Sequence, residues 1–277
     1  MLGAIAGDVI GSRFEHAGIK SKDFDLFNRQ SAFTDDTVHT IALADSILNK
    51  VPYQDKLREY FQSYPNVGYG GRFRRWAESP TPAPYCSYGN GSAMRVSPVA
   101  WLYDTLEDVL SEAQKSATVT HNHPQGIRGA RAVAGAIFMA RSGAGKAKIR
   151  FYLEDACNYD LSASIDEISP HYRFDVSCQG SVPQAITAFL EAVDFEDAVR
   201  NAVSLGGDSD TQACIAGSIA EAYFGGVPDH IKAQTLSFLD QRMLSVLQLF
   251  DDQGKQPGTH TFLGFLRLNA NRRSGSL

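Results

Sequence analysis

Apolar residues recur every three to four positions along most of this chain, and this spacing limits the possible folds more than any other feature. An α-helix has about 3.6 residues per turn, so such a spacing places the apolar side chains on one helical face. The faces found in this way are Val38, Ile41, Ala42 and Leu48; Val99, Leu102, Leu106, Val109 and Leu110; Ile127, Ala130, Val133, Ala134, Ile137 and Phe138; Val182, Ile186, Phe189, Leu190 and Val193; and Ile215, Ile219, Ala222 and Tyr223. Alternating apolar and polar runs are nearly absent, and only F-D-V-S-C, starting at Phe174, is a candidate for a short strand. We therefore predict an all-α fold.

No segment divides the chain into parts. It has no Gly/Ser-rich or acidic linker and no internal repeat, so residues 1–277 are predicted to form a single domain. The tail, from about 268 to 277, ends in polar residues and is expected to fray. Two loops rich in Gly, Pro and Tyr, at 64–73 and 78–95, separate the predicted helices. Loops of this length are uncommon in a helical domain unless they have a function, so we predict that they bind a ligand.

The composition excludes several classes of protein. Hydrophobic residues make up 43% of the chain and charged residues 21%, and the net charge is -5, so neither disorder nor general nucleic-acid binding is expected. A nucleic acid that carries a small modification stays open as a substrate. Asp8 and Arg13 interrupt the first apolar run before it reaches the length of a signal peptide or membrane span. We expect a soluble, cytoplasmic monomer with no membrane partner.

The cysteines do not form a recognisable metal or disulfide pattern. The four of them, Cys86, Cys157, Cys178 and Cys214, are scattered with no C-x-x-C pair. A chain of this size does not need disulfides for stability, and free cysteines are among the most buried residues. We predict reduced thiols, mostly buried, and no zinc site.

Acidic residues gather at the starts of two predicted helices. F-T-D-D-T at 33–37 supplies Thr34, Asp35 and Asp36, and G-G-D-S-D-T at 206–211 supplies Asp208, Asp210 and Thr211. Either set alone is consistent with helix capping, because Asp and Thr are favoured N-caps and negative charge is stabilised at a helix N-terminus. A cap needs only one side-chain oxygen, however, and each set offers three.

A meeting of the two helix starts would create a charge problem. Two like charges about 4 Å apart repel by roughly 4 kcal/mol at an effective dielectric constant of 20, so four carboxylates in a small volume need a counter-charge. Carboxylate and hydroxyl oxygens without cysteine ligands suit the hard cations Mg²⁺, Mn²⁺ and Ca²⁺. The sequence thus predicts a site for divalent cations, in which two ions share one carboxylate.

Six segments, in this order, resemble the ADP-ribosylglycohydrolase family. They are G-D-V-I-G-S-R-F-E (7–15), F-T-D-D-T (33–37), S-Y-G-N-G-S-A-M-R (87–95), T-H-N-H-P (120–124), Q-G-S-V-P-Q-A-I (179–186) and G-G-D-S-D-T (206–211). The resemblance runs from residue 3 to about 225. It implies an all-α orthogonal helix bundle with a cleft for ADP-ribose and a centre of two metal ions, Mg²⁺ or Mn²⁺.

The resemblance also implies roles for individual residues. The metal ligands by this resemblance are Thr34, Asp35, Asp36, Asp208, Asp210, Thr211 and Glu15, with Asp210 bridging the two ions. Glu15 matches a family glutamate that either coordinates a metal or swings away as substrate enters; the alternative is an acidic surface residue. Asp35, Asp36 and Glu15 are all candidates for the catalytic base. Asp8 lies near the same segment, and we favour a structural role for it.

Substrate contacts are implied mainly in the second loop. The expected substrate-binding residues are Ser87, Tyr88, Gly89, Asn90, Gly91, His121, Gly70, Gly180 and Ser181. Glycines expose backbone N–H groups that can surround phosphate oxygens, and Tyr88 offers a flat surface for ribose or adenine. His121 is expected near the ribose and phosphates, although a single histidine more often satisfies a core hydrogen bond. His123 is expected to be structural or to lie at the rim.

The activity implied is hydrolysis of the glycosidic bond between ADP-ribose and an acceptor, which is a protein side chain or another ADP-ribosylated molecule. The alternative from another class is a non-catalytic ADP-ribose sensor or a structural relative, but all six core ligands are present here. D-S-D-T could also begin a haloacid-dehalogenase-type phosphohydrolase motif, but that motif resembles D-x-D-x-T after a buried strand, and Thr211 directly follows Asp210. The acceptor itself stays open, because the segments expected at the mouth of the cleft, 72–76 and 80–85, contain no motif that identifies it.

Overall fold

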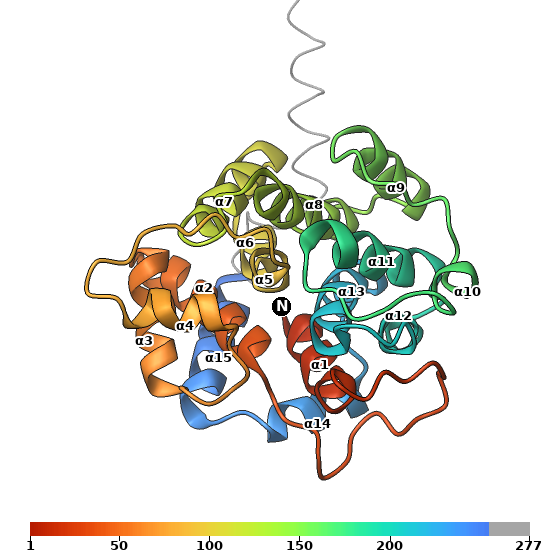
Figure 1. Ribbon diagram of the computed structural model, residues 1–277, viewed down its shortest axis with the longest axis horizontal. Coiled ribbons are helices and arrows are strands. Elements are labelled where there is room, and N and C mark those ends of the chain that lie inside the picture. The colour runs from red at the N-terminus through yellow and green to blue at the C-terminus, as the bar shows by residue number, and fades with distance from the viewer. Residues whose placement is uncertain (255–277) are drawn as a thin grey trace, which may run out of the picture.

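Helices form the described part of the chain, residues 1–254, in the computed structural model (Figure 1). Their bounds are α1 Leu2–Gly11, the 3-10 helix η1 Ser12–Phe14, α2 Asp35–Asn49, α3 Tyr53–Ser63, α4 Gly71–Glu78, α5 Gly91–Met94, α6 Ser97–Leu102, α7 Leu106–Thr118, α8 Pro124–Arg141, α9 Lys146–Asp155, α10 Ile165–Ile168, α11 Cys178–Glu191, α12 Phe195–Ser204, α13 Ser209–Phe224, α14 Asp229–Ser237 and α15 Gln241–Gly254. The all-α prediction is confirmed. The frayed tail predicted at 268–277 lies outside the described residues.

The short strand that was considered at Phe174 does not form. Within residues 1–254 this segment makes a single antiparallel bridge, between Ser177 and Gly89, and no ladder follows. The reason is local: Asp175 Oδ1 accepts the N–H of Ser177, and the Ser177 side chain then caps α11. The extended backbone therefore ends after one pairing.

Helix α1 is the central element of the bundle and packs mainly along α13 (Figure 1). Three glycines spaced four residues apart, Gly3, Gly7 and Gly11, form the face of α1 that touches α13. A Cβ added to Gly7 would lie 2.0 Å from the carbonyl oxygen of Ala213, and one added to Gly11 would lie 2.4 Å from that of Ser209. The two backbones are thus in direct contact, which only glycine permits. This contact brings the last turn of α1 against the first turn of α13.

Two hydrophobic clusters lie on either side of α1. Ala6 and Ile10 pack into one, with residues of α8, α11, α12 and α13, and Ile5 and Val9 pack into the other, with residues of α2, α3, α4 and α15. Residues 3–11 are consequently buried on every side of the helix. None of the helices in residues 1–254 is long and apolar enough to cross a membrane.

Candidate metal centre and substrate-binding loop

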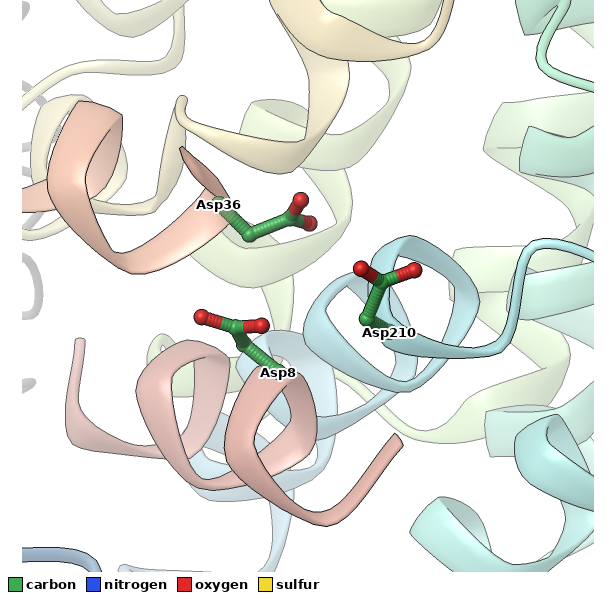
Figure 2. A group of neighbouring side chains, drawn as sticks. All are labelled: Asp8, Asp36 and Asp210. Carbon is green, nitrogen blue, oxygen red and sulfur yellow. The ribbon is translucent and has the colours of Figure 1, made fainter. Parts of the chain in front are cut away.

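Three helices each contribute a buried carboxylate to one point in the bundle (Figure 2). Asp8 comes from α1, Asp36 from the first turn of α2 and Asp210 from the first turn of α13. One oxygen of each lies within 4.8 Å of the others. Carboxylates this close repel one another unless protons or a cation compensate their charge.

A second group of acids shares one member with the first. Glu15, which directly follows η1, and Asp208 and Asp210 also offer oxygens within 4.8 Å of one another. Glu15 is half-buried and the two aspartates are buried. Since Asp210 belongs to both groups, the two groups of acids adjoin at one shared carboxylate.

Asp8 also fixes the position of α2. Its carboxylate accepts the backbone N–H groups of Thr34 at 2.9 Å and Thr37 at 3.0 Å, and both hydroxyls also donate to it. A carboxylate on α1 thus caps the N-terminus of α2 from outside that helix. The structural role expected for Asp8 is present, together with a place beside Asp36 and Asp210.

Burial and mutual repulsion raise the pKa values of these acids. The pKa of Asp8 is raised to about 6, chiefly by burial, and that of Asp35 to about 8, by burial and then by the charges of Asp8 and Asp208. The pKa values of Asp36 and Asp210 lie well above their ordinary values for the same reasons, burial first. Among residues 1–254, no lysine or arginine forms an ion pair with any of these aspartates. In the part of the chain that the structure describes, these aspartates therefore have no paired lysine or arginine, and protons or a bound cation must compensate their charge.

The donor set fits a hard divalent cation. Asp36 Oδ1 is buried and has no hydrogen-bond partner in the described part of the chain, although its other oxygen receives the Thr211 hydroxyl at 3.3 Å. A buried carboxylate oxygen without a partner is costly, and a metal ion would remove that cost. All the ligands that these groups offer are oxygens, as Mg²⁺ and Mn²⁺ prefer.

The other predicted ligands surround this centre in different ways. Thr34 caps α2, and its hydroxyl donates to Asp8 at 2.8 Å. Asp35 belongs to neither carboxylate group, and its Oδ1 lies 3.4 Å from the position of a Cβ on Gly68. Thr211 faces Asp36 from α13. The sequence-predicted ligands thus meet in space, with Asp35 on the side of the first Gly-rich loop.

Asn90 connects the predicted substrate loop to the acidic centre. Its side-chain amide donates to Asp208 Oδ2 at 2.7 Å and to the Ser181 hydroxyl at 3.2 Å, and all three side chains are buried. Its backbone N–H donates to Val176 at 2.8 Å. The loop is therefore held by the start of α11 and by one acid of the centre.

The remaining predicted substrate residues differ in exposure. Tyr88 is 49% exposed, and its ring and that of His123 form a T-shaped pair with centroids 5.5 Å apart. His121 is buried beneath Gly89 and Gly91, and Ser87 is buried beside them. A Cβ on Gly70 would meet open space, whereas one on Gly180 would collide with Asp175. Packing against Asp175 thus explains the glycine at position 180. At position 70, none of the described residues would contact an added side chain.

A cavity of about 310 Å³ lies on the α4 side, where the mouth was expected. Arg72, Arg75, Trp76, Ser79, Pro82, Ala83 and Tyr85 line it. Arg72 stacks on Tyr85, whose ring lies 6.0 Å from that of His121. Segments 72–76 and 80–85, which were expected at the mouth, therefore lie next to each other near the substrate loop.

Comparison with known proteins decides the family. A family model described as ADP-ribosylglycohydrolase matches residues 1–257. The chain belongs to the ADP-ribosylglycohydrolase family. The family resemblance predicted from the six segments is thus confirmed.

The relatives of this chain are distant in sequence. The mouse and human proteins named ADP-ribosylhydrolase ARH3 are 27% and 26% identical to it; both alignments cover 81% of this chain, and they cover 82% and 84% of the respective relatives. An uncharacterised protein of Archaeoglobus fulgidus is 27% identical over 83% of this chain and 88% of its own. A solved structure titled "ADP-ribosylglycohydrolase-related protein complex" superposes with a TM-score of 0.71 at 24% identity, covering 91% of this chain and 95% of its own. That structure supports the fold alone.

The place of Asp8 in the first carboxylate group was not predicted. The signal was visible, because Asp8 is the only charged residue in the segment L-G-A-I-A-G-D-V-I-G. A carboxylate in a helix buried on all sides needs partners.

The haloacid-dehalogenase-type alternative for D-S-D-T also finds no support, because the segment before α13 is the helix α12 followed by a short turn, and not a strand.

Proposed function

We propose that this protein is a metal-dependent hydrolase that cleaves the glycosidic bond between ADP-ribose and an acceptor, and so reverses ADP-ribosylation. One observation carries the proposal: two groups of carboxylates share Asp210, and no lysine or arginine of residues 1–254 forms an ion pair with any of them. Membership of the family gives the substrate class. We propose two Mg²⁺ or Mn²⁺ ions as cofactors.

The proposed roles of the side chains follow from their positions. When bound, the ions supply Lewis-acid stabilisation of the charge that develops on oxygen during cleavage. Asp8, Asp36, Asp208, Asp210 and Glu15 would hold them, with Thr34 and Thr211 beside. Asp35, outside both carboxylate groups, is the strongest of the three candidates for the base that takes a proton from the attacking water. The remaining carboxylates would stabilise positive charge at the anomeric carbon.

Substrate binding is proposed at the loop 87–91. Tyr88 would cover the adenosine end, the backbone of Gly89 and Gly91 would face the diphosphate, and Gly180 and Ser181 would support the loop from α11. Gly70 would border the cleft on the opposite side. Asn90, held by Asp208, would couple the loop to the metal centre.

A panel of defined substrates tests this proposal. Purified protein with Mg²⁺ or Mn²⁺ is incubated with ADP-ribosyl-serine, ADP-ribosyl-arginine, O-acetyl-ADP-ribose and an ADP-ribosylated oligonucleotide, and released ADP-ribose is measured. We expect release from at least one of them and none in EDTA. Binding of ADP-ribose without release from any substrate would instead favour the non-catalytic sensor.

The cellular setting and assembly stay predictions of the sequence. The four cysteines are free, and Cys157, Cys178 and Cys214 are buried, which supports a reducing compartment such as the cytoplasm. A monomer is the simplest proposal, and size-exclusion chromatography with light scattering tests it.

A further inference from the structure

Arg95 is a fully buried cation that forms no ion pair within residues 1–254, although the more distant charge of Asp35 acts on it. Its side chain is 0% exposed, and no carboxylate in residues 1–254 forms an ion pair with it. Nη2 donates to the carbonyl of Ser116 and to the hydroxyl of Thr120, both at 2.8 Å. Burying a charge in this way is costly, so a role beyond packing is expected for Arg95.

The contact with Arg95 determines what the Thr120 hydroxyl can do. A guanidinium has only donors, so Thr120 Oγ1 accepts from Arg95. The other partner of this hydroxyl is Nδ1 of the neighbouring His121, at 2.7 Å. The hydroxyl has one proton, and among the described residues no other acceptor bonds to it. The network therefore favours donation of the Thr120 proton to His121 Nδ1, because an Nδ1–H donating to the second lone pair of Oγ1 would leave the buried hydroxyl proton without an acceptor.

His121 is kept neutral where it lies. It is 6% exposed, and burial, followed by the charges of Arg95 and Arg72, lowers its pKa well below the ordinary value. A neutral imidazole has one N–H, and with Nδ1 accepting, that proton resides on Nε2. The Tyr85 ring lies 6.0 Å from that of His121, and His39 is near enough for its pKa to respond to the charge of His121.

Nε2 faces the proposed substrate loop. A Cβ added to Gly91 would lie 3.2 Å from it, and one added to Gly89 would lie 3.6 Å away. At these two positions no side chain covers Nε2. The backbone of Thr120 holds the same loop, since its carbonyl accepts the N–H groups of Tyr85 and Ser87.

We propose that Arg95 and Thr120 are positioning residues that fix the His121 proton on Nε2, so that His121 donates a hydrogen bond to a phosphate or hydroxyl oxygen of the ADP-ribosyl group. The tautomer of His121 is a property of the protein itself. The hydrogen bond from Nε2 to the ADP-ribosyl group rests on the proposed function. A proton on Nδ1 would leave a lone pair on Nε2 that repels a phosphate oxygen, which can only accept. The buried charge of Arg95 thus acts on the ligand through Thr120 and His121.

The tautomer is measured directly by ¹⁵N NMR of histidine-labelled protein, with the His121 signals assigned by comparison with His121→Gln. In wild type and in Thr120→Ser, which keeps the hydroxyl, we expect the proton on Nε2. In Thr120→Val, which has nearly the same shape, we expect a shift of population to the Nδ1–H form. A Thr120→Val protein that keeps the proton wholly on Nε2 would overturn the inference.

Calorimetric titration with ADP-ribose in the presence of Mg²⁺ tests the proposed hydrogen bond from His121 to the substrate. We expect Thr120→Val to weaken binding about tenfold, the cost of a lost or reversed hydrogen bond, and Thr120→Ser to stay within about twofold of wild type. Equal losses in both variants, or no loss in either, would overturn the role on substrate. Thermal unfolding by circular dichroism confirms that each variant is folded. If wild type itself binds no ADP-ribose, the proposed function fails, whereas the NMR result still decides the tautomer.

Discussion

At the scale of single residues, Asp210 has the central place in the candidate metal centre. It is the member that the two carboxylate groups share, and it lies in the first turn of α13 between Asp208 and Thr211. Removing its charge therefore disturbs both proposed ion sites, whereas loss of any other acid disturbs only one.

Asp210→Asn is predicted to abolish high-affinity Mn²⁺ binding at both sites and to lower hydrolysis by at least about 100-fold, because an amide oxygen is a weaker ligand than a carboxylate. Calorimetric titration with Mn²⁺ and an ADP-ribose release assay measure the two effects. Asp229→Asn, which changes an acid in the first turn of α14, is the matched control and should behave as wild type.

The raised pKa values predict how the metal-free protein responds to pH. Asp8, with a pKa of about 6, and Asp35, with a pKa of about 8, hold their protons more tightly in the folded than in the unfolded state. As the pH rises from about 4 to 8, the unfolded state loses these protons first, so the free energy of unfolding falls.

In EDTA, unfolding by urea should therefore cost at least about 1 kcal/mol less at pH 8 than at pH 5.5. Added Mn²⁺ should restore stability at pH 8, because the ion binds the deprotonated acids. Greater stability of the metal-free protein at pH 8 would contradict the raised pKa values of Asp8 and Asp35.

At the scale of elements, the contact between α1 and α13 holds the acids together. Gly7 stands opposite Ala213 with no room for a side chain, and Asp8 is the next residue. A wider separation of these helices would move Asp8 away from both Asp36 and Asp210.

Gly7→Ala is predicted to destabilise the protein by about 2–3 kcal/mol, through overpacking, and to weaken Mn²⁺ binding. Urea unfolding and metal titration measure the two effects. Gly145→Ala is the control, because a Cβ there meets nothing within 4 Å and the backbone is not left-handed. Similar losses in both variants would contradict the account of the helix contact.

Helices and motif residues were predictable from sequence to different degrees. The ligand segments at 34–36 and 208–211 were found because acids, hydroxyls and helix starts coincide in the local sequence. The contacts of Asp8 with Thr34 and Thr37 join residues more than 25 positions apart, and periodicity carries no such information. The Arg95, Thr120 and His121 network likewise forms only when α5 packs beside α7.

At the scale of the whole molecule, α1 belongs to both hydrophobic clusters. Ile5 and Val9 pack on one side and Ala6 and Ile10 on the other, so neither cluster is complete without this helix. We propose on this basis that the chain unfolds as one cooperative unit, as expected for a single domain.

Differential scanning calorimetry of the metal-free protein should then show one transition whose calorimetric and van't Hoff enthalpies agree. Ile5→Ala changes one cluster and Ile10→Ala changes the other. Each substitution should lower the midpoint of that same transition. Two separable transitions, each responding to only one substitution, would show that the chain forms two domains.

The central claim is that acids from three helices hold two ions which hydrolysis of the ADP-ribosyl bond requires. The most direct test is ADP-ribose release by metal-free protein during stepwise addition of Mn²⁺, with the substrate that the panel identifies. The account predicts no release at the start and a rise to a plateau at two ions per chain. Release that is full in EDTA, or that stays absent at saturating Mn²⁺, would contradict it.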